Sequence, residues 1–163
     1  MNPLSTCDLC DAHRDDASGA FRVLPPPWAA FGAVARFQGP VSTVQCFEDN
    51  SAVRAALETP GEGRVLVIAG GGSLRTALVG GNLAALASRH GWAGMVVDGC
   101  VRDRAELDAC DIGIRAAMLC PMPPGKHGQG RRDVPVPVRG VWVRPGEFLV
   151  ADADGVVVLS RWP

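Results

Sequence analysis

The sequence predicts a mixed α/β domain in which helix-linked strands occupy the middle of the chain and largely antiparallel strands flank them. Two continuous apolar runs, residues 64–72 and 93–99, are typical of strands buried on both faces of a sheet. Between them, leucine and alanine recur at helical spacing over residues 78–91. The last third of the chain holds short apolar runs separated by tight turns, which indicate antiparallel strands. The length of 163 residues fits one domain, residues 1–163.

The first elements of the chain are predicted to be a helix and a loop. Ser5 or Thr6 can cap a helix that runs to about Arg14, with Asp8 in its first turn. Residues 23–32, VLPPPWAAFG, are too rich in proline for regular structure and are expected to form a loop.

A β-hairpin and a second helix are predicted next. Apolar and polar residues alternate over residues 33–47 on both sides of Gly39-Pro40, which indicates two strands joined by a Gly-Pro turn. The following helix is expected to begin near Asp49 or Asn50, which can cap it, and to end at Pro60-Gly61.

The second half of the chain alternates strands with helices before it becomes all-β. The helix over residues 78–91 is expected to end at Gly91, a typical C-terminal glycine. A short helix is predicted over residues 102–110 and a third strand over residues 112–119. Residues 121–133 are rich in glycine and proline and are predicted to form a mobile loop. The C-terminal strands are expected at residues 134–138, 140–143, 147–152 and 155–160.

The composition argues against several classes of protein. The net charge is −1 and no run of basic residues is longer than Arg131-Arg132, so the basic surface of a nucleic-acid-binding protein is missing. The N-terminus lacks the basic region and apolar stretch of a signal peptide, and no apolar run approaches the length of a membrane span. We therefore expect a soluble, cytoplasmic protein.

The six cysteines are expected to be reduced thiols, many of them buried. Cys7 and Cys10, with His13 nearby, have a spacing that also occurs in zinc sites. No second Cys/His pair with ligand spacing follows, and the segment has the pattern of an amphipathic helix. The thiol interpretation is favoured, and a metal or redox role is the alternative.

Two glycine clusters raise the question of anion binding. The glycines at 70–72 lack the lysine of a nucleotide phosphate loop and the third glycine of a dinucleotide fingerprint. Gly80-Gly81-Asn82-Leu83 instead opens the longest apolar helix, where free backbone N–H groups and the helix dipole can bind a carboxylate. A tight turn without a ligand is the alternative.

Arg102 and Asp103 lie after a predicted strand and at the start of a predicted helix. Ligand sites of open α/β sheets tend to lie in such turns. The planar guanidinium of Arg102 suits a carboxylate, and Asp103 offers a hard oxygen ligand for Mg²⁺ or Mn²⁺. From the pattern alone, a solvated helix start, with Asp103 near the N-terminal amides, is the favoured interpretation.

These motifs together resemble a known family. The segments GRVLVIAGGGSLRTALVGGNLA, GWAGMVVDGCVRD and ADADGVVVL are similar to those of the RraA-like family, named after the regulator of ribonuclease activity A. The family also contains class II 4-hydroxy-4-methyl-2-oxoglutarate aldolases and proteins once mislabelled as menaquinone-pathway methyltransferases. The resemblance runs from about Thr6 to Leu159, and residues 63–103 are its most specific part.

The resemblance implies a swivelling β/β/α domain that assembles as a trimeric ring, with sites between subunits. It implies that Asp103 binds a divalent metal, Mg²⁺ or Mn²⁺, and that Arg102 contacts the substrate, which makes these two the expected catalytic residues. In the aldolases, backbone groups at the preceding helix start hold the pyruvyl carboxylate. The matching substrate-binding positions are Gly80, Gly81, Asn82 and Leu83.

One position departs from the aldolase pattern. The aldolases usually carry an acidic residue in the water-mediated shell of the metal, at the position of Gly81. Loss of such an outer-shell group commonly weakens metal affinity or activity by roughly 10–100-fold. The founding ribonuclease regulator lacks the Asp after the Arg, whereas this chain retains Asp103. The sequence therefore lies between the two groups.

The resemblance leaves two main functions open, and a structural ring protein with a vestigial site is a weaker third. The first is a metal-dependent lyase that cleaves 2-oxo acids through a pyruvate enolate, as a 4-hydroxy-4-methyl-2-oxoglutarate aldolase that also decarboxylates oxaloacetate. The second is a non-catalytic inhibitor of an endoribonuclease such as ribonuclease E. Either protein would be a homotrimer or a hexamer.

Overall fold

A curled sheet of ten strands organises residues 4–163, the part of the chain that the computed structural model describes. The strands are β1 Phe21–Val23, β2 Ala29–Phe31, β3 Phe37–Gln45, β4 Val65–Ala69, β5 Ala77–Val79, β6 Gly94–Val101, β7 Gly113–Leu119, β8 Arg131–Arg132, β9 Val136–Val138, β10 Val141–Val143, β11 Phe148–Ala151 and β12 Val156–Leu159. The helices are α1 Thr6–Ala12, α2 Ser51–Leu57, α3 Gly81–Arg89 and α4 Arg104–Ala109. The main path of the sheet is β1-β12-β11-β3-β4-β6-β7-β2, with β5 on β6 and β8 on β3, while β9 and β10 form a separate pair.

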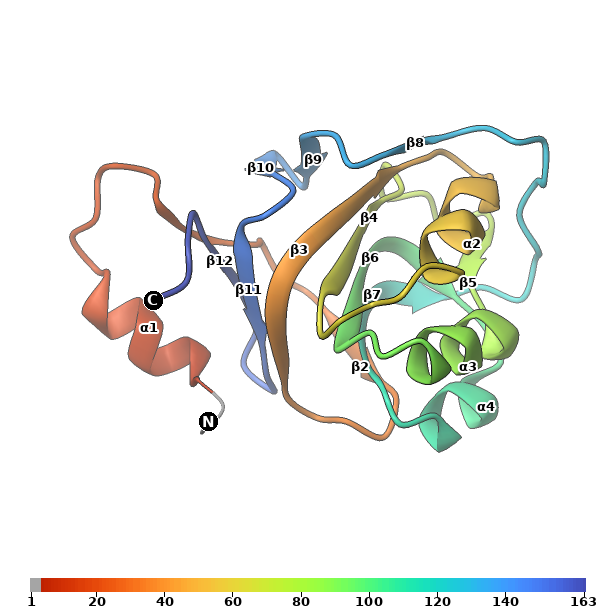
Figure 1. The fold of residues 1–163 in the computed structure, drawn as a ribbon, viewed down its shortest axis with the longest axis horizontal. Helices are drawn as coiled ribbons and strands as arrows, with labels where there is room; N and C mark the ends of the chain where they lie inside the picture. The colour runs from red at the N-terminus through yellow and green to blue at the C-terminus, as the bar shows by residue number, and fades with distance from the viewer. Residues whose placement is uncertain (1–3) are drawn as a thin grey trace.

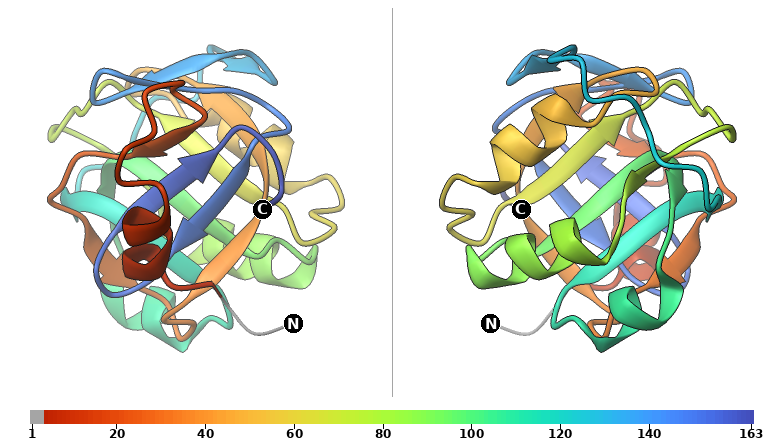
Figure 2. Two further views of the ribbon diagram at one scale, coloured as in Figure 1. Left: turned by 90° about the vertical axis from the view of Figure 1, so that its left-hand side faces the viewer. Right: turned by 90° about the vertical axis from the view of Figure 1, so that its right-hand side faces the viewer.

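The centre of the sheet is parallel, as the sequence predicts. β3, β4, β6 and β7 run in the same direction, and every residue of β4 and β6 is buried. Burial on both faces explains why these strands have continuous apolar runs rather than alternating ones. The helices α2, α3 and α4 lie together over one face of these strands (Figures 1 and 2). Leu66 and Ile68 point into the core that these helices share with the sheet.

The antiparallel strands cover the other face. Val65 and Val67 alternate with Leu66 and Ile68 and join a second core with residues of β9, β11 and β12. The outer side of β11 and β12 is covered by α1, whose Leu9 contributes to a third, smaller cluster (Figure 1). The predicted mixed α/β architecture, with antiparallel strands flanking a parallel centre, is confirmed.

The hairpin predicted around Gly39-Pro40 is wrong. One continuous strand, β3, runs through both residues; its first half pairs with β11 and its second half with β4. Gly39 lies so close to the carbonyl group of Gly63 that a Cβ would clash with it. The pair therefore marks a close approach between segments at the point where the strand changes partners, and not a turn.

Three further differences concern short strands and one loop. The proline-rich segment 23–32 contains β2, and β5 precedes α3 within the segment predicted to be helical. Residues 121–133, predicted to be a mobile loop, contain β8 and are hydrogen-bonded to the start of α2: the His127 N–H donates to Asp49 Oδ2 at 2.6 Å. Such short strands depend on a neighbour's edge, which local sequence does not reveal.

The predicted helices are confirmed, including the cap of α1, where Ser5 Oγ accepts from the Asp8 N–H at 3.3 Å. Gly91, with φ +76°, follows the end of α3 as expected for a C-terminal glycine. Among residues 4–163, no helix is both long and apolar enough to span a membrane.

Candidate functional site

Two segments with candidate residues meet at the ends of neighbouring parallel strands. β5 ends at Val79 and leads through Gly80 into α3, while β6 ends at Val101 and leads through Arg102 and Asp103 into α4. β5 pairs with β6, and the Arg102 N–H donates to the Val79 carbonyl at 3.0 Å. The two turns therefore form one edge of the sheet, where the carboxyl ends of strands commonly build ligand sites.

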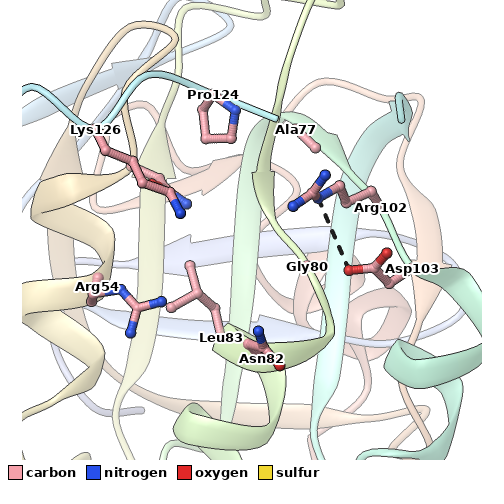
Figure 3. Close-up of a pocket in the computed structure, with 10 residues that line it drawn as sticks. Arg54, Ala77, Gly80, Asn82, Leu83, Arg102, Asp103, Pro124 and Lys126 are labelled. Carbon is pink, nitrogen blue, oxygen red and sulfur yellow. Dashed lines mark ion pairs between the residues drawn. The ribbon is translucent and has the colours of Figure 1, made fainter. Parts of the chain in front are cut away.

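A small pocket of about 60 Å³ opens at this edge (Figure 3). Arg102 points into it from one side, and Asn82 and Leu83 form its floor at the start of α3. Gly81 does not line the pocket. The full lining is Asn50, Arg54, Ala77, Gly80, Asn82, Leu83, Arg102, Asp103, Pro124 and Lys126. Five of the six predicted site residues thus come together at one cavity.

Asp103 has an unusual backbone conformation. Its φ of 62° and ψ of 50° lie in the left-handed region, which costs a non-glycine residue about 1–3 kcal/mol and which Asp tolerates better than most residues. The carboxylate oxygen Oδ2 accepts the Gly81 N–H at 3.1 Å, and the side chain is 41% exposed. Helix α4 receives no cap bond from this side chain. The strained residue therefore holds its carboxylate against the start of α3, beside the pocket.

Arg102 is held beside this carboxylate. Its Nε lies 4.0 Å from Asp103 Oδ2, and its Nη1 donates to the Pro121 carbonyl at 3.4 Å. The ion pair is half exposed and loose, so it contributes little to stability. The guanidinium keeps most of its donors free to bind an anion in the pocket.

The structure explains the glycine at position 81. A Cβ built on Gly81 would coincide with the carboxylate of Glu106 and lie 2.7 Å from the Glu106 Cβ. An acidic side chain is therefore present at this place, but it comes from α4 rather than α3. Sequence reasoning missed Glu106. The available signal was its spacing three residues after Asp103, which puts both carboxylates on the same side of the helix start.

Two more basic side chains lie across the pocket from Arg102. Arg54 reaches in from α2 and Lys126 from the loop before β8 (Figure 3). With Arg102 they give the cavity three positive charges against the single carboxylate of Asp103. The pocket therefore has the electrostatic character of a site for a small anion.

The donor set fits a hard divalent cation only in its hydrated form. Residues 4–163 contain no cluster of three or more His, Cys, Asp or Glu side chains arranged to hold a metal. Mg²⁺ commonly binds through one or two carboxylates and keeps several waters. Asp103 lines the pocket and Glu106 lies beside Gly81 outside the lining, so these are the two carboxylates that would hold such a hydrated ion.

The cysteines are free thiols. The carboxylate of Asp154 raises the pKa of the Cys7 thiol, and burial raises that of Cys10. Both shifts favour the protonated thiol over the thiolate that binds metals, so they weigh against the zinc alternative.

Comparison with known proteins identifies relatives over nearly the whole chain. The family model described as RraA-like, Aldolase/RraA, matches residues 6–158. A protein of Albidiferax ferrireducens, provisionally named as a 4-hydroxy-4-methyl-2-oxoglutarate aldolase, is 58% identical over 169 residues and 98% of each chain.

Solved structures agree with this result. The RNA-processing inhibitor RraA from Thermus thermophilis is 48% identical, with a TM-score of 0.92 over 100% of this chain and 96% of that one. A structure from Geobacillus kaustophilus, named S-adenosylmethionine:2-dimethylmenaquinone methyltransferase, is 45% identical, with a TM-score of 0.92 over 98% and 96% of the two chains. The chain therefore belongs to the RraA-like family, which groups aldolases with the RNA-processing inhibitor RraA.

Proposed function

We propose that the protein is a class II, divalent-metal-dependent lyase that cleaves 2-oxo acids through the enolate of pyruvate. Its reactions would be aldol cleavage of 4-hydroxy-4-methyl-2-oxoglutarate and decarboxylation of oxaloacetate. The observation that carries the proposal is the meeting of Arg102, Asp103 and the start of α3 at one pocket, with the Glu106 carboxylate in the space that Gly81 leaves. The provisional aldolase name of the 58% identical relative supports it.

The start of α3 would bind the substrate carboxylate. First-turn N–H groups of a helix have no partners within the helix, and the helix dipole favours an anion there. The Gly81 N–H is already directed to Asp103, which leaves the amides of Asn82 and Leu83 as the expected donors. A side chain at position 80 would displace the Asp103 carboxylate, because a Cβ there would lie 2.7 Å from Asp103 Oδ2.

Arg102 would orient the substrate and stabilise negative charge as the C–C bond breaks. Its backbone is fixed to Val79 and its Nη1 to Pro121, so the guanidinium is preorganised rather than drawn in from solvent. Charge stabilisation by such preorganised donors commonly contributes several kcal/mol, about 2.7–4 kcal/mol per donor in known cases.

Asp103 would hold Mg²⁺ or Mn²⁺, with Glu106 positioned to accept hydrogen bonds from the water shell. The ion would supply Lewis-acid polarisation of the 2-oxo group. Aldol cleavage and decarboxylation share one electronic demand: the electron pair of the broken bond stays on C3 of the pyruvyl half. One site can therefore serve both reactions.

Pyruvate release from oxaloacetate tests this proposal. The purified protein is assayed with Mg²⁺ or Mn²⁺, with and without chelator. The rate of decarboxylation by the free metal ion without protein is subtracted. We expect turnover that chelator abolishes and added metal restores. Absence of metal-dependent turnover above background would refute the proposed lyase activity.

Asp103→Asn tests the assignment of the ligand. Asn has the same shape and tolerates the left-handed conformation, so the fold should persist while turnover is lost. The matched control is Asp111→Asn, which removes an exposed carboxylate just beyond α4 and should retain turnover. Equal rates in wild type and Asp103→Asn would exclude Asp103 as the ligand.

We also propose that the protein forms a trimeric ring. Such a ring would cover exposed apolar side chains: Phe47, Leu74, Met118 and Met122. Light scattering after size-exclusion chromatography should give about three times the chain mass of 17.1 kDa, and a monomer would contradict the proposal.

The alternative function is inhibition of an endoribonuclease of the ribonuclease E type. It is supported by the 48% identity to the RNA-processing inhibitor RraA over the full chain. RNA cleavage by ribonuclease E, measured with micromolar protein added, separates the two functions, because Asp103→Asn should leave any inhibition intact. If the rate of RNA cleavage is the same with and without the added protein, this alternative function is excluded. A cytoplasmic location, where both reactions would take place, stays a prediction.

A further inference from the structure

One side chain of the candidate pocket can transfer a proton and has no role in the proposed function. Within residues 4–163, the lining holds four ionisable side chains: Arg54, Arg102, Asp103 and Lys126. A guanidinium stays protonated in proteins, and the Asp103 carboxylate is assigned to the metal. The chain contains 16 lysine and arginine residues, and Lys126 is the only lysine among them. Its ammonium group, unlike a guanidinium, can give up a proton and take it back.

The backbone on both sides of Lys126 is fixed to the segment before α2. The Gly125 N–H donates to the Glu48 carbonyl at 2.7 Å. The His127 N–H donates to Asp49 Oδ2 at 2.6 Å. Because both neighbours of Lys126 are held, its side chain enters the pocket from a defined position and not from a free surface loop.

The Lys126 side chain is free to act on a bound molecule. It points into the pocket from the wall opposite Arg102 (Figure 3). It forms no ion pair with a carboxylate of residues 4–163. The residue is exposed, so water reaches its side chain. Its proton is therefore not shared with a structural partner, and solvent can restore it after each turnover.

The substrate contacts of the proposed function direct the reacting carbon toward this wall. C2 of a 2-oxo acid is trigonal, so the carboxylate, the oxo oxygen and C3 leave it in three directions of one plane. The carboxylate would lie at the start of α3, and the oxo oxygen on the side of Asp103. The third direction leads to the opposite wall, which holds Arg54 and Lys126 (Figure 3). Of these two side chains, only Lys126 can transfer a proton.

We propose that the Lys126 ammonium is the general acid that protonates C3 of the pyruvate enolate. This inference rests on the proposed function and assigns the proton donor of its reaction. Once the C–C bond has broken, its electron pair lies in the C2–C3 double bond of the enolate. That pair forms the new C3–H bond with a proton from Nζ, the N–H bond breaks, and the C2 carbonyl is restored. Lysine is left as a neutral amine, which takes a proton from water.

Exchange of the pyruvate methyl hydrogens in D₂O with Mg²⁺, followed by NMR, isolates this step. By microscopic reversibility, the group that delivers the proton to C3 also removes it. Lys126→Met keeps the length of the side chain without the proton, so exchange should fall roughly 100–10,000-fold, the usual contribution of a general acid or base. Lys126→Arg keeps the charge without a transferable proton and should be similarly slow. Exchange at the wild-type rate in Lys126→Arg would overturn the assignment, because charge alone would then suffice.

A matched control and a chemical rescue exclude a merely structural role. Arg132→Met removes an exposed cation of β8 that does not line the pocket, and it should exchange at the wild-type rate. Lys126→Ala leaves room for a small amine, so added methylamine should restore part of the exchange at a rate that rises with its concentration. A lysine that only supports the loop gives no such response. Absence of restoration would therefore contradict Lys126 as the proton donor.

Decarboxylation of oxaloacetate separates this inference from the lyase proposal. CO₂ leaves before the proton is needed, and an enolate that escapes can be protonated by water. Lys126→Met should therefore lose less in CO₂ release than in exchange, whereas equal losses would reject the acid, since structural damage affects both steps alike. A wild-type protein that exchanges pyruvate hydrogens without turning over oxaloacetate refutes only the lyase. One that releases CO₂ without exchange refutes only the acid, and one that does neither refutes both.

Discussion

The close contact between position 81 and Glu106 gives the sharpest test of the proposed metal site. Gly81→Asp puts an acid where the resemblance to the aldolases implies one, and the sequence alone predicts that this raises activity. The structure predicts the opposite for the single variant. The new Cβ would lie 2.7 Å from the Glu106 Cβ, closer than side-chain carbons normally approach, and two carboxylates would share one space.

The size of the effect follows from this contact. The exposed carboxylate of Glu106 can swing away, but its Cβ is fixed by α4, so the helices have to separate slightly. Overpacking of this kind costs about 1–3 kcal/mol in the free energy of unfolding. Removal of the Glu106 carboxylate alone should lower metal-dependent activity by roughly 10–100-fold, as loss of an outer-shell group commonly does.

A double-mutant cycle tests this coupling with four proteins: wild type, Gly81→Asp, Glu106→Ala and the double variant. Urea unfolding gives the free energies, and Mg²⁺-dependent release of pyruvate gives the activity. In the double variant the acid has moved from α4 to α3, so it should be more stable than Gly81→Asp and more active than Glu106→Ala. Strictly additive effects, with the double variant worse than either single one, would refute the idea that the two positions supply one carboxylate.

Three further predictions concern residues around the site and the fold. Hydrogen bonds from Thr6 hold the pKa of Asp152 below its usual range despite burial. The ionised carboxylate therefore stabilises the folded protein above about pH 3.9, and this stabilisation is lost as the pH falls through the lower pKa of the folded state. Asp152→Asn should therefore cost about 1–3 kcal/mol at pH 7 and less at pH 3, by urea unfolding. Asp49→Ala should release the loop that carries Lys126, which lines the pocket, and weaken Mg²⁺-dependent binding of pyruvate several-fold in a calorimetric titration; unchanged binding would contradict this. Burial raises the pKa of the Cys46 thiol to about 12, so this thiol should resist iodoacetamide at pH 8 in the native protein, and rapid labelling would contradict its burial.

The sequence predicted the parallel centre of the fold because those strands are buried on both faces. Continuous apolar runs such as residues 64–72 lack the alternating polar residues of a half-exposed strand or helix. The helix between the runs is long enough for apolar residues to recur at helical spacing. The local sequence does not predict the short strands β2 and β8, because their pairing partners, β7 and β3, lie far away along the chain. The local sequence predicts a turn at Gly39-Pro40, because local preference does not reveal that another backbone passes close to Gly39.

The candidate site was predictable only in part. Arg102, Asp103 and the start of α3 each lie in a strand-to-helix turn, which is a local signal. Arg54 and Lys126 carry no such signal: one looks like a helix surface residue and the other like part of a loop. Only the pairing of the loop with the start of α2 brings them to the pocket, through contacts such as that of Asn50 with Gly125.

A glycine in place of an acid does not by itself mean a lost function. What a hydrated metal needs is a carboxylate at a certain place, and either of two facing helix starts can provide it. If Glu106 takes this role, α3 has to carry glycine at position 81, since the two side chains exclude each other. The identities of residues 81 and 106 then depend on each other: glutamate at 106 requires glycine at 81. Under the proposed function, Gly81 does not make the chain an incomplete aldolase, because Glu106, beside Gly81 in the space between α3 and α4, would supply the second carboxylate.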